Sequence, residues 1–236
     1  MKVWYLHHSS FGLEIDDKFL IFDYFYDTSV DDNKELTSGV INPDQIKDYE
    51  VYVFASHRHH DHFNEIIFDW MDTLENVTYI LSDDIPVMTR NAIQLEAHKV
   101  YEIDDIKIKT LRSNDEGLAF IIYVNKRCIF FSGDLNWWHW EDEPNEWNKE
   151  KEHEFKTEYE TLKNHKIDIA FIPVDPRLED SYSKSLKYFL SQGHKSVIFP
   201  MHFGDDYRIF DWLKRDKLDQ HVMKIHKRGQ EYIIGD

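Results

Sequence analysis

The stretch Ser56-His57-Arg58-His59-His60-Asp61-His62-Phe63 determines most of what this sequence predicts. It follows Val51-Tyr52-Val53-Phe54-Ala55, an apolar run rich in β-branched and aromatic residues that predicts a buried strand. The chain has 14 histidines, so a single one would carry little weight, but four donors in H-x-H-x-D-H spacing on one strand-end loop do. Imidazole nitrogen and carboxylate oxygen are preferred ligands of Zn²⁺. We therefore predict a metal site for one or two ions whose ligands include His57, His59, Asp61 and His62.

Other apolar segments also end in residues that suit a metal site. Phe130-Phe131-Ser132-Gly133-Asp134 is a predicted strand that ends in Gly-Asp, and Val197–His202 is one that ends in His. Phe19–Asp23 is an earlier strand that ends in Asp, and Tyr5–Phe11 contains His7-His8-Ser9.

In this order, these motifs resemble the metallo-β-lactamase fold superfamily of hydrolases, and the branch that includes L-ascorbate-6-phosphate lactonase in particular. The resemblance implies that His57 and His59 bind metal one, that Asp61, His62 and His202 bind metal two, and that Asp134 bridges both. It also implies an α/β (α+β) fold, the four-layer αββα sandwich, formed by residues 1–236 as a single hydrolase domain.

One element departs from the family pattern. A third histidine for metal one normally lies between the central motif and the Gly-Asp, but here Ser113-Asn114-Asp115 stands in that place. Asp115 and His139 are the candidate substitutes, and Asn114, Asp115 and His139 are also candidates for contact with substrate or support of a ligand. Because affinity depends on the number and type of ligands, we expect metal one to be the weaker or the empty site unless one of these replaces the lost donor.

Composition narrows the class of protein. Hydrophobic residues make up 42% and aromatic residues 15% of the 236 residues, which indicates a folded chain with a large core. No apolar run is long enough to cross a membrane, and the N-terminus lacks a signal-peptide core, so we expect a cytoplasmic protein.

The single cysteine, Cys128, lies in a predicted strand and is interpreted as a buried inert thiol. A net charge of −17 makes nucleic acid an unfavourable partner and leaves a small molecule as the expected substrate. The sequence leaves the oligomeric state open.

The remaining pattern predicts alternating strands and helices, without a linker or a low-complexity segment. Helices are expected at 42–45, 65–74, 144–163, 181–190 and 207–213. Strands are expected at 3–6, 11–15, 19–22, 51–55, 78–81, 106–111, 118–124, 128–131, 167–173 and 197–200, with two closing strands after them.

Several residues beside the predicted ligands are candidates for catalysis or substrate contact. A metal-bound hydroxide would be the nucleophile, and Asp61 can orient it or take its proton. His8 is a candidate either for supporting a ligand by a hydrogen bond or for contact with the transition state, and Asp23 for holding a ligand histidine by its second ring nitrogen. Arg177 either binds a substrate carboxylate or phosphate or pairs with a nearby acid. Among Trp137, Trp138 and Trp140, which follow the Gly-Asp, at least one is expected to line a pocket.

The sequence thus predicts a metal-dependent hydrolase of a small polar ester, lactone or phosphoester, with Zn²⁺ expected and Mn²⁺ or Fe²⁺ open. A phosphodiesterase acting on a nucleotide or RNA is one alternative, disfavoured by the acidic charge. A non-enzymatic metal-binding or sensor protein is the other, and the missing third histidine motivates it.

Overall fold

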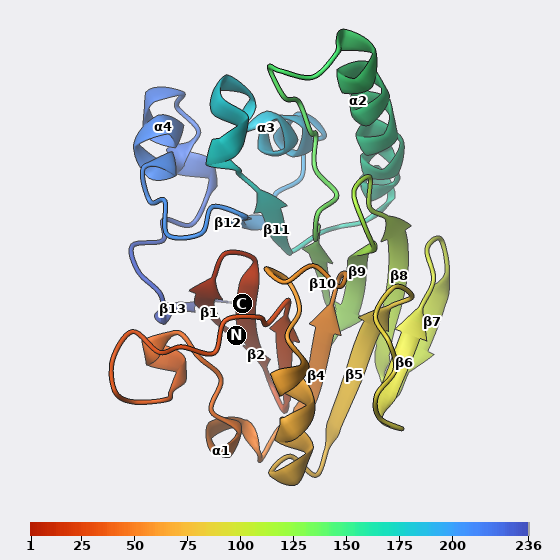
Figure 1. Cartoon of the computed structure of the whole chain (residues 1–236), viewed down its shortest axis with the longest axis vertical. Helices are drawn as coiled ribbons and strands as arrows, with labels where there is room; N and C mark the ends of the chain where they lie inside the picture. Colours follow the sequence, from red (N-terminus) through yellow and green to blue (C-terminus); the bar gives the residue numbers. More distant parts are fainter. Residues whose placement is uncertain (236) are drawn as a thin grey trace. The chain divides into compact units, whose positions relative to one another are not determined.

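A computed structural model describes residues 1–235 (Figure 1). The chain divides into two compact units, each built around one β-sheet. Unit 1 comprises residues 1–95 and 225–236, and unit 2 comprises residues 96–224. Each is described below by itself.

Unit 1 contains a seven-stranded sheet with the strand order β13-β1-β2-β3-β4-β5-β6. Its strands are β1 (Lys2–His7), β2 (Ser10–Ile15), β3 (Lys18–Phe22), β4 (Glu50–Ala55), β5 (Val77–Ser82), β6 (Ala92–Leu95) and β13 (Gln230–Ile233). The neighbours β3, β4, β5 and β6 run parallel, so their carboxyl ends lie at one edge of the sheet.

Alternate residues of these strands form the core of unit 1 on one face of the sheet. Val51, Val53 and Ala55 of β4 belong to it, as expected when successive side chains point to opposite faces. The covering segments include the short helices η1 (Leu36–Ser38), α1 (Pro43–Ile46) and η2 (Glu65–Asp72). The α1 helix starts with Pro43, and the Asn42 side chain caps it by accepting a hydrogen bond from the Asp44 N–H.

Unit 2 contains a six-stranded sheet with the order β12-β11-β10-β9-β8-β7. Its strands are β7 (Val100–Ile103), β8 (Ile106–Arg112), β9 (Leu118–Val124), β10 (Arg127–Phe131), β11 (Ile169–Pro173) and β12 (Val197–Met201). Its helices are α2 (Asn145–Tyr159), η3 (Glu160–Asn164), η4 (Pro176–Ser181), α3 (Lys184–Ser191), α4 (Ile209–Arg215) and η5 (Asp219–His221). The ring of Phe130 in β10 packs against Tyr159 of α2 and Phe189 of α3, which places these helices on one face of the sheet. The strands β10, β11 and β12 are parallel neighbours, so they too end at one edge.

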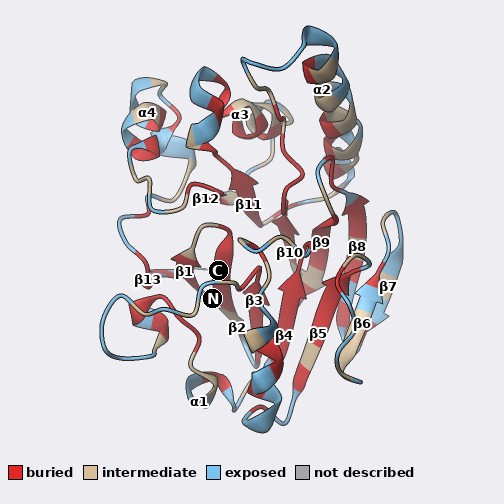
Figure 2. Cartoon of the chain, in the orientation of Figure 1, coloured by how far each residue is buried: buried red, intermediate tan, exposed pale blue. Residues whose placement is uncertain are grey.

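Most predicted elements are confirmed, and the differences concern one helix, two edge strands and the closing strands. The segment predicted as a helix at 65–74 is the 3₁₀ helix η2, and the edge strands β6 and β7 were not predicted. Figure 2 shows β7 largely exposed, and it therefore lacks the buried alternation that marks a strand in sequence. The prediction of two closing strands is wrong within residues 1–235. After β12, β13 is the strand that forms in this part of the chain, and the segment before it hydrogen-bonds to β12 from Met223 N to Ile198 O at 2.7 Å without forming a strand.

No helix among residues 1–235 combines the length and apolar character needed to cross a membrane. Cys128 is a buried free cysteine, and burial raises the pKa of its thiol to about 11, in agreement with an inert thiol.

Candidate metal centre

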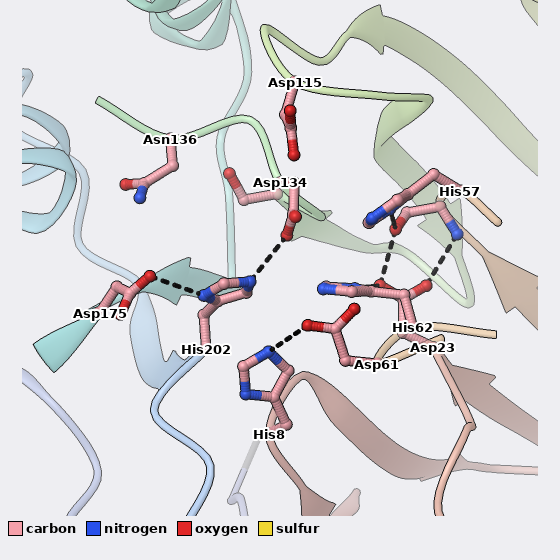
Figure 3. Close-up of polar contacts among 12 residues, drawn as sticks. His8, Asp23, His57, Asp61, His62, Asp115, Asp134, Asn136, Asp175 and His202 are labelled. Atoms are coloured by element: carbon pink, nitrogen blue, oxygen red, sulfur yellow. Dashed lines mark hydrogen bonds and ion pairs between the residues drawn. The ribbon is translucent and has the colours of Figure 1, made fainter. Parts of the chain in front are cut away.

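In unit 1 the predicted ligands lie on the loop after β4, next to the residue that ends β3. Asp23 directly follows β3, and its N–H donates to the carbonyl of Phe54 in β4 at 2.9 Å. Because β3 and β4 are parallel, Asp23 and the loop from Ser56 to His62 come together at the same sheet edge. Figure 3 shows Asp23 and His62 side by side.

Asp23 orients two of the histidines. It is fully buried, and its Oδ2 lies 2.7 Å from His62 Nδ1. Ser56 donates to it twice, from its N–H and its hydroxyl, each at 2.7 Å, and the same hydroxyl lies 2.9 Å from His57 Nδ1. Ligand atoms of Asp23, His57 and His62 all lie within 4.8 Å of one another. The chain thus holds His62 directly and His57 through Ser56.

The other residues of the motif surround this group. The ring centroid of His59 lies 4.6 Å from that of His57, whereas His60 is exposed. His8 Nε2 lies 3.7 Å from Asp61 Oδ2, and its ring centroid lies 5.5 Å from that of His62 (Figure 3). Unit 1 thus gathers His8 with the four motif residues. We call these four, His57, His59, Asp61 and His62, the unit 1 donors.

In unit 2 the same kind of edge carries Asp134 and His202, which we call the unit 2 donors. Asp134 follows β10, Asp175 follows β11 and His202 follows β12, three neighbouring parallel strands. His202 Nε2 lies 3.1 Å from Asp134 Oδ1, and its Nδ1 lies 3.1 Å from Asp175 Oδ2 (Figure 3). The imidazole therefore lies between two buried carboxylates.

These buried neighbours shift the pKa values of His202 and Asp175. Burial lowers the pKa of His202, but the two carboxylates outweigh it and raise that pKa to about 9. Burial likewise raises the pKa of Asp175, but hydrogen bonds from His202 and Arg177 hold it below its usual value. The metal-free protein keeps a proton on His202 that a metal ion must displace.

The backbone is unusual at three of these residues. His8, Asp23 and His202 have positive φ angles of 53°, 43° and 67°. Such left-handed conformations are uncommon for residues other than glycine, and they cluster at functional sites in folded proteins. All three lie at strand ends of the two donor regions, so the fold holds these side chains in place at a conformational cost.

The chemistry of the donors fits a divalent metal ion. The Nδ1 atoms of His57 and His62 face a hydroxyl and a carboxylate, an arrangement that assigns the proton to Nδ1 and the lone pair to Nε2. The Nδ1 of His202 also faces a carboxylate, that of Asp175, so loss of the proton on Nε2 makes that atom able to bind a metal. Metal-binding histidines almost always donate their second ring N–H in this way. The oxygen donors Asp61 and Asp134 complete a set that suits Zn²⁺, Mn²⁺ or Fe²⁺.

Of the three tryptophans that follow the Gly-Asp, Trp138 lies beside the unit 2 donors and Trp140 lines a cavity. Trp138 donates its indole N–H to the Asp134 carbonyl at 3.2 Å, and its ring meets His202 edge to face at 5.7 Å. Trp140 stacks on Trp138 and borders a cavity of about 370 Å³ that Arg177 also lines. Trp137 packs instead against Phe155 and Tyr188, on the side of α2 and α3.

Arg177 makes the ion pair that was one of its two expected roles. Its Nη2 lies 2.7 Å from Asp175 Oδ2, its Nε lies 3.0 Å from each carboxylate oxygen, and its side chain is 55% exposed. Asp175 itself was not predicted. It ends a strand next to the one that carries a ligand histidine, as Asp23 does, and this parallel is the signal that could have identified it.

The segment that lacks the expected third histidine contains Asn114 and Asp115. Asn114 is buried, and its side chain hydrogen-bonds to the backbone of Asn136. Asp115 projects toward Asp134 in Figure 3, and His139 Nε2 lies 4.0 Å from Glu141 Oε1. Within residues 1–235, neither Asp115 nor His139 joins a group of three or more His, Cys, Asp or Glu ligand atoms within 4.8 Å of one another. Replacement of the lost donor by either residue stays a prediction.

The two-sheet α/β architecture, with donors at strand ends, is the metallo-β-lactamase fold, and solved structures share it. A metallo hydrolase of the archaeon Ignicoccus hospitalis matches with a TM-score of 0.63 and 14% identity over 99% of both chains. The isothiocyanate hydrolase from Delia radicum gut bacteria matches with a TM-score of 0.65 and 11% identity, also over 99% of both. The metallo-β-lactamase fold protein YhfI of Bacillus subtilis matches with a TM-score of 0.62 and 12% identity over 98% of both. No protein-family model and no curated protein sequence matches the chain.

Proposed function

We propose that the chain is a metal-dependent hydrolase and that its unit 1 and unit 2 donors together hold the metal. The observation that carries the proposal is that in each unit a buried aspartate holds a histidine by its Nδ1: Asp23 holds His62, and Asp175 holds His202. Oriented imidazoles of this kind are what metal centres require. The similar fold of two hydrolases, over both units of this chain, supports the same proposal.

In this proposal Asp134 and His202 bind the metal from unit 2, and His57, His59, Asp61 and His62 bind it from unit 1. The metal supplies Lewis acidity, and so lowers the pKa of a bound water toward neutrality. With a metal bound, Asp61 would be placed to accept the proton of that water on a carboxylate oxygen. His8, whose Nε2 lies 3.7 Å from Asp61 Oδ2, would donate a hydrogen bond to the substrate oxygen on which negative charge develops.

The proposed substrate is a small polar ester, lactone or phosphoester, of the kind suggested by the lactonase branch. The net charge of −17 favours such a small molecule over RNA. A cytoplasmic location belongs to the proposal as well.

The test is metal-dependent turnover of generic substrates. The chelated protein is reloaded separately with Zn²⁺, Mn²⁺ and Fe²⁺, and metal content is measured beside the hydrolysis of p-nitrophenyl acetate, a simple lactone and bis-p-nitrophenyl phosphate. We expect ester or lactone hydrolysis that depends on metal. Tight metal binding without turnover of any of the three would favour a sensor, and turnover of the phosphodiester alone would favour the phosphodiesterase.

His60→Ala is the matched control for His62→Ala. Both change a histidine of the same loop, but His60 is exposed and His62 is fully buried against Asp23. Turnover that survives in His62→Ala as well as it does in His60→Ala would assign the activity to a contaminant.

A further inference from the structure

The loop between β10 and α2, residues 133–143, carries Asp134 and has no regular secondary structure. Buried backbone N–H and C=O groups in such a loop need partners from elsewhere. Asn136 is only 2% exposed, so its backbone groups cannot rely on bulk water. Side chains from neighbouring elements supply the missing partners.

Asn114, from the loop after β8, supplies them to Asn136. Its Oδ1 accepts from the Asn136 N–H at 3.1 Å, and its Nδ2 donates to the Asn136 carbonyl at 2.9 Å. A second bond from Nδ2 reaches the Lys151 carbonyl of α2 at 3.2 Å, and Lys151 Nζ donates to the Asn114 carbonyl at 2.7 Å. One buried amide thus ties the loop to β8 and to α2.

Asn148 of α2 makes the same paired contact at Trp140. Its Oδ1 accepts from the Trp140 N–H at 3.0 Å, and its Nδ2 donates to the Trp140 carbonyl at 2.8 Å. Both asparagines are buried, at 7% exposure for Asn114 and 5% for Asn148. The loop is therefore held by the same paired chemistry at Asn136 and at Trp140, in addition to the hydrogen bonds that Ser185 makes with the Trp137 N–H and the Asn136 side chain.

The two points differ in what they hold. Asn136 lies two residues beyond Asp134, whose carboxylate faces His202 at 3.1 Å. Trp140 lies six residues beyond Asp134, and its ring stacks on Trp138 and lies 5.9 Å from the Arg177 guanidinium carbon. The first point is thus next to a predicted ligand, and the second is next to the cavity that Trp140 and Arg177 line.

We propose that Asn114 is a positioning residue of the metal centre, which fixes Asp134 against His202 by pairing with the Asn136 backbone. The proposal rests on the proposed function. It gives a role to the segment that lacks the expected third histidine. Where the family pattern has a ligand, this chain has an amide that holds the loop of another ligand.

The experiment compares Asn114→Ala with Asn148→Ala, which removes the same pair of bonds four residues further along the loop. The first readout uses metal-free protein: the imidazole ¹⁵N and ¹H resonances of His202 report its contact with Asp134. The second is the Zn²⁺ dissociation constant, measured by competition with a chelator. The melting temperature of each variant shows how much of a change is general destabilisation. Asn114→Ser replaces Asn114→Ala if the alanine variant does not fold.

We expect Asn114→Ala to shift the His202 resonances and to weaken Zn²⁺ binding by about 10–100-fold, the usual effect of losing a support of a ligand. We expect Asn148→Ala to leave the His202 resonances in place and to change the dissociation constant less than about threefold on the same scale. Unchanged His202 resonances in Asn114→Ala, or equal effects of the two variants, would overturn the proposal. If the resonances respond as expected but the unmodified chain binds no Zn²⁺, the positioning role stands and the proposed function fails.

Discussion

His62 in unit 1 and His202 in unit 2 are held by the same device in different electrostatic surroundings. In each unit a buried aspartate ends one parallel strand, and the histidine lies beyond the next strand, with its Nδ1 on that carboxylate. Asp23 also accepts from the neutral Ser56. Asp175 pairs with the cation Arg177, and a second carboxylate, that of Asp134, faces the other nitrogen of His202.

The difference shows what each unit contributes. Asp23 orients two imidazoles, that of His62 directly and that of His57 through Ser56, so unit 1 holds them in place before any ion arrives. In unit 2, the proton on His202 takes the place of a cation between two carboxylates, and Arg177 offsets part of the remaining negative charge. Unit 2 must therefore lose a proton when it binds metal.

The largest effect is expected from the loss of a supported histidine. His62→Ala or His202→Ala should remove metal and hydrolysis together, with a loss of affinity beyond the about 10–100-fold that is typical of supporting residues. Elemental analysis and initial rates check this, with His60→Ala as the control. Full metal content in His202→Ala would show that the unit 1 donors suffice alone.

Asp61→Asn separates chemistry from binding. It keeps one donor oxygen but removes the proton acceptor, so turnover should fall by about 10²–10⁴-fold while metal content falls less. Rates measured at full metal loading provide the comparison. A fully loaded variant that turns over like the unmodified chain would disprove the role of Asp61 as a base.

Asp23→Asn and Asp175→Asn compare the two devices directly. Each should weaken metal binding within the range of about 10–100-fold, and Asp23→Asn should do more, because Asp23 supports His57 as well as His62. Dissociation constants check the order, with the exposed Asp180→Asn as the control. A larger loss in Asp175→Asn would reverse our ranking of the two units.

The smallest effect concerns the stability of the metal-free protein. The pKa of His202 is raised from 6.5 to about 9 in the folded chain, so its contribution to the free energy of unfolding is complete below pH 6.5 and is lost as the pH rises through about 9. Denaturant titrations from pH 6 to 10 should show this loss in the unmodified chain and a flatter profile in His202→Asn. Parallel profiles would contradict the shift.

Much of this could be predicted from sequence, for definable reasons. The strand through Val53 and the H-x-H-x-D-H loop are local patterns, and both could be found by inspection. The strand ends that carry Asp134 and His202 could be predicted from the apolar runs that precede them. Asp175 was not predicted because its contact with His202 joins the ends of two strands 27 positions apart, which local composition does not reveal. The paired contacts of Asn114 and Asn148 join residues that are 22 and 8 positions apart, and nothing in local composition marks them.

The central claim is that one metal centre draws on donors of both units. Anomalous diffraction at the zinc edge, from crystals of the Zn²⁺-loaded protein, tests it most directly. The account predicts an ion within about 2.0–2.2 Å of Nε2 of both His62 and His202. An ion bound only by unit 1 donors, with His202 Nε2 still paired to Asp134, would contradict it.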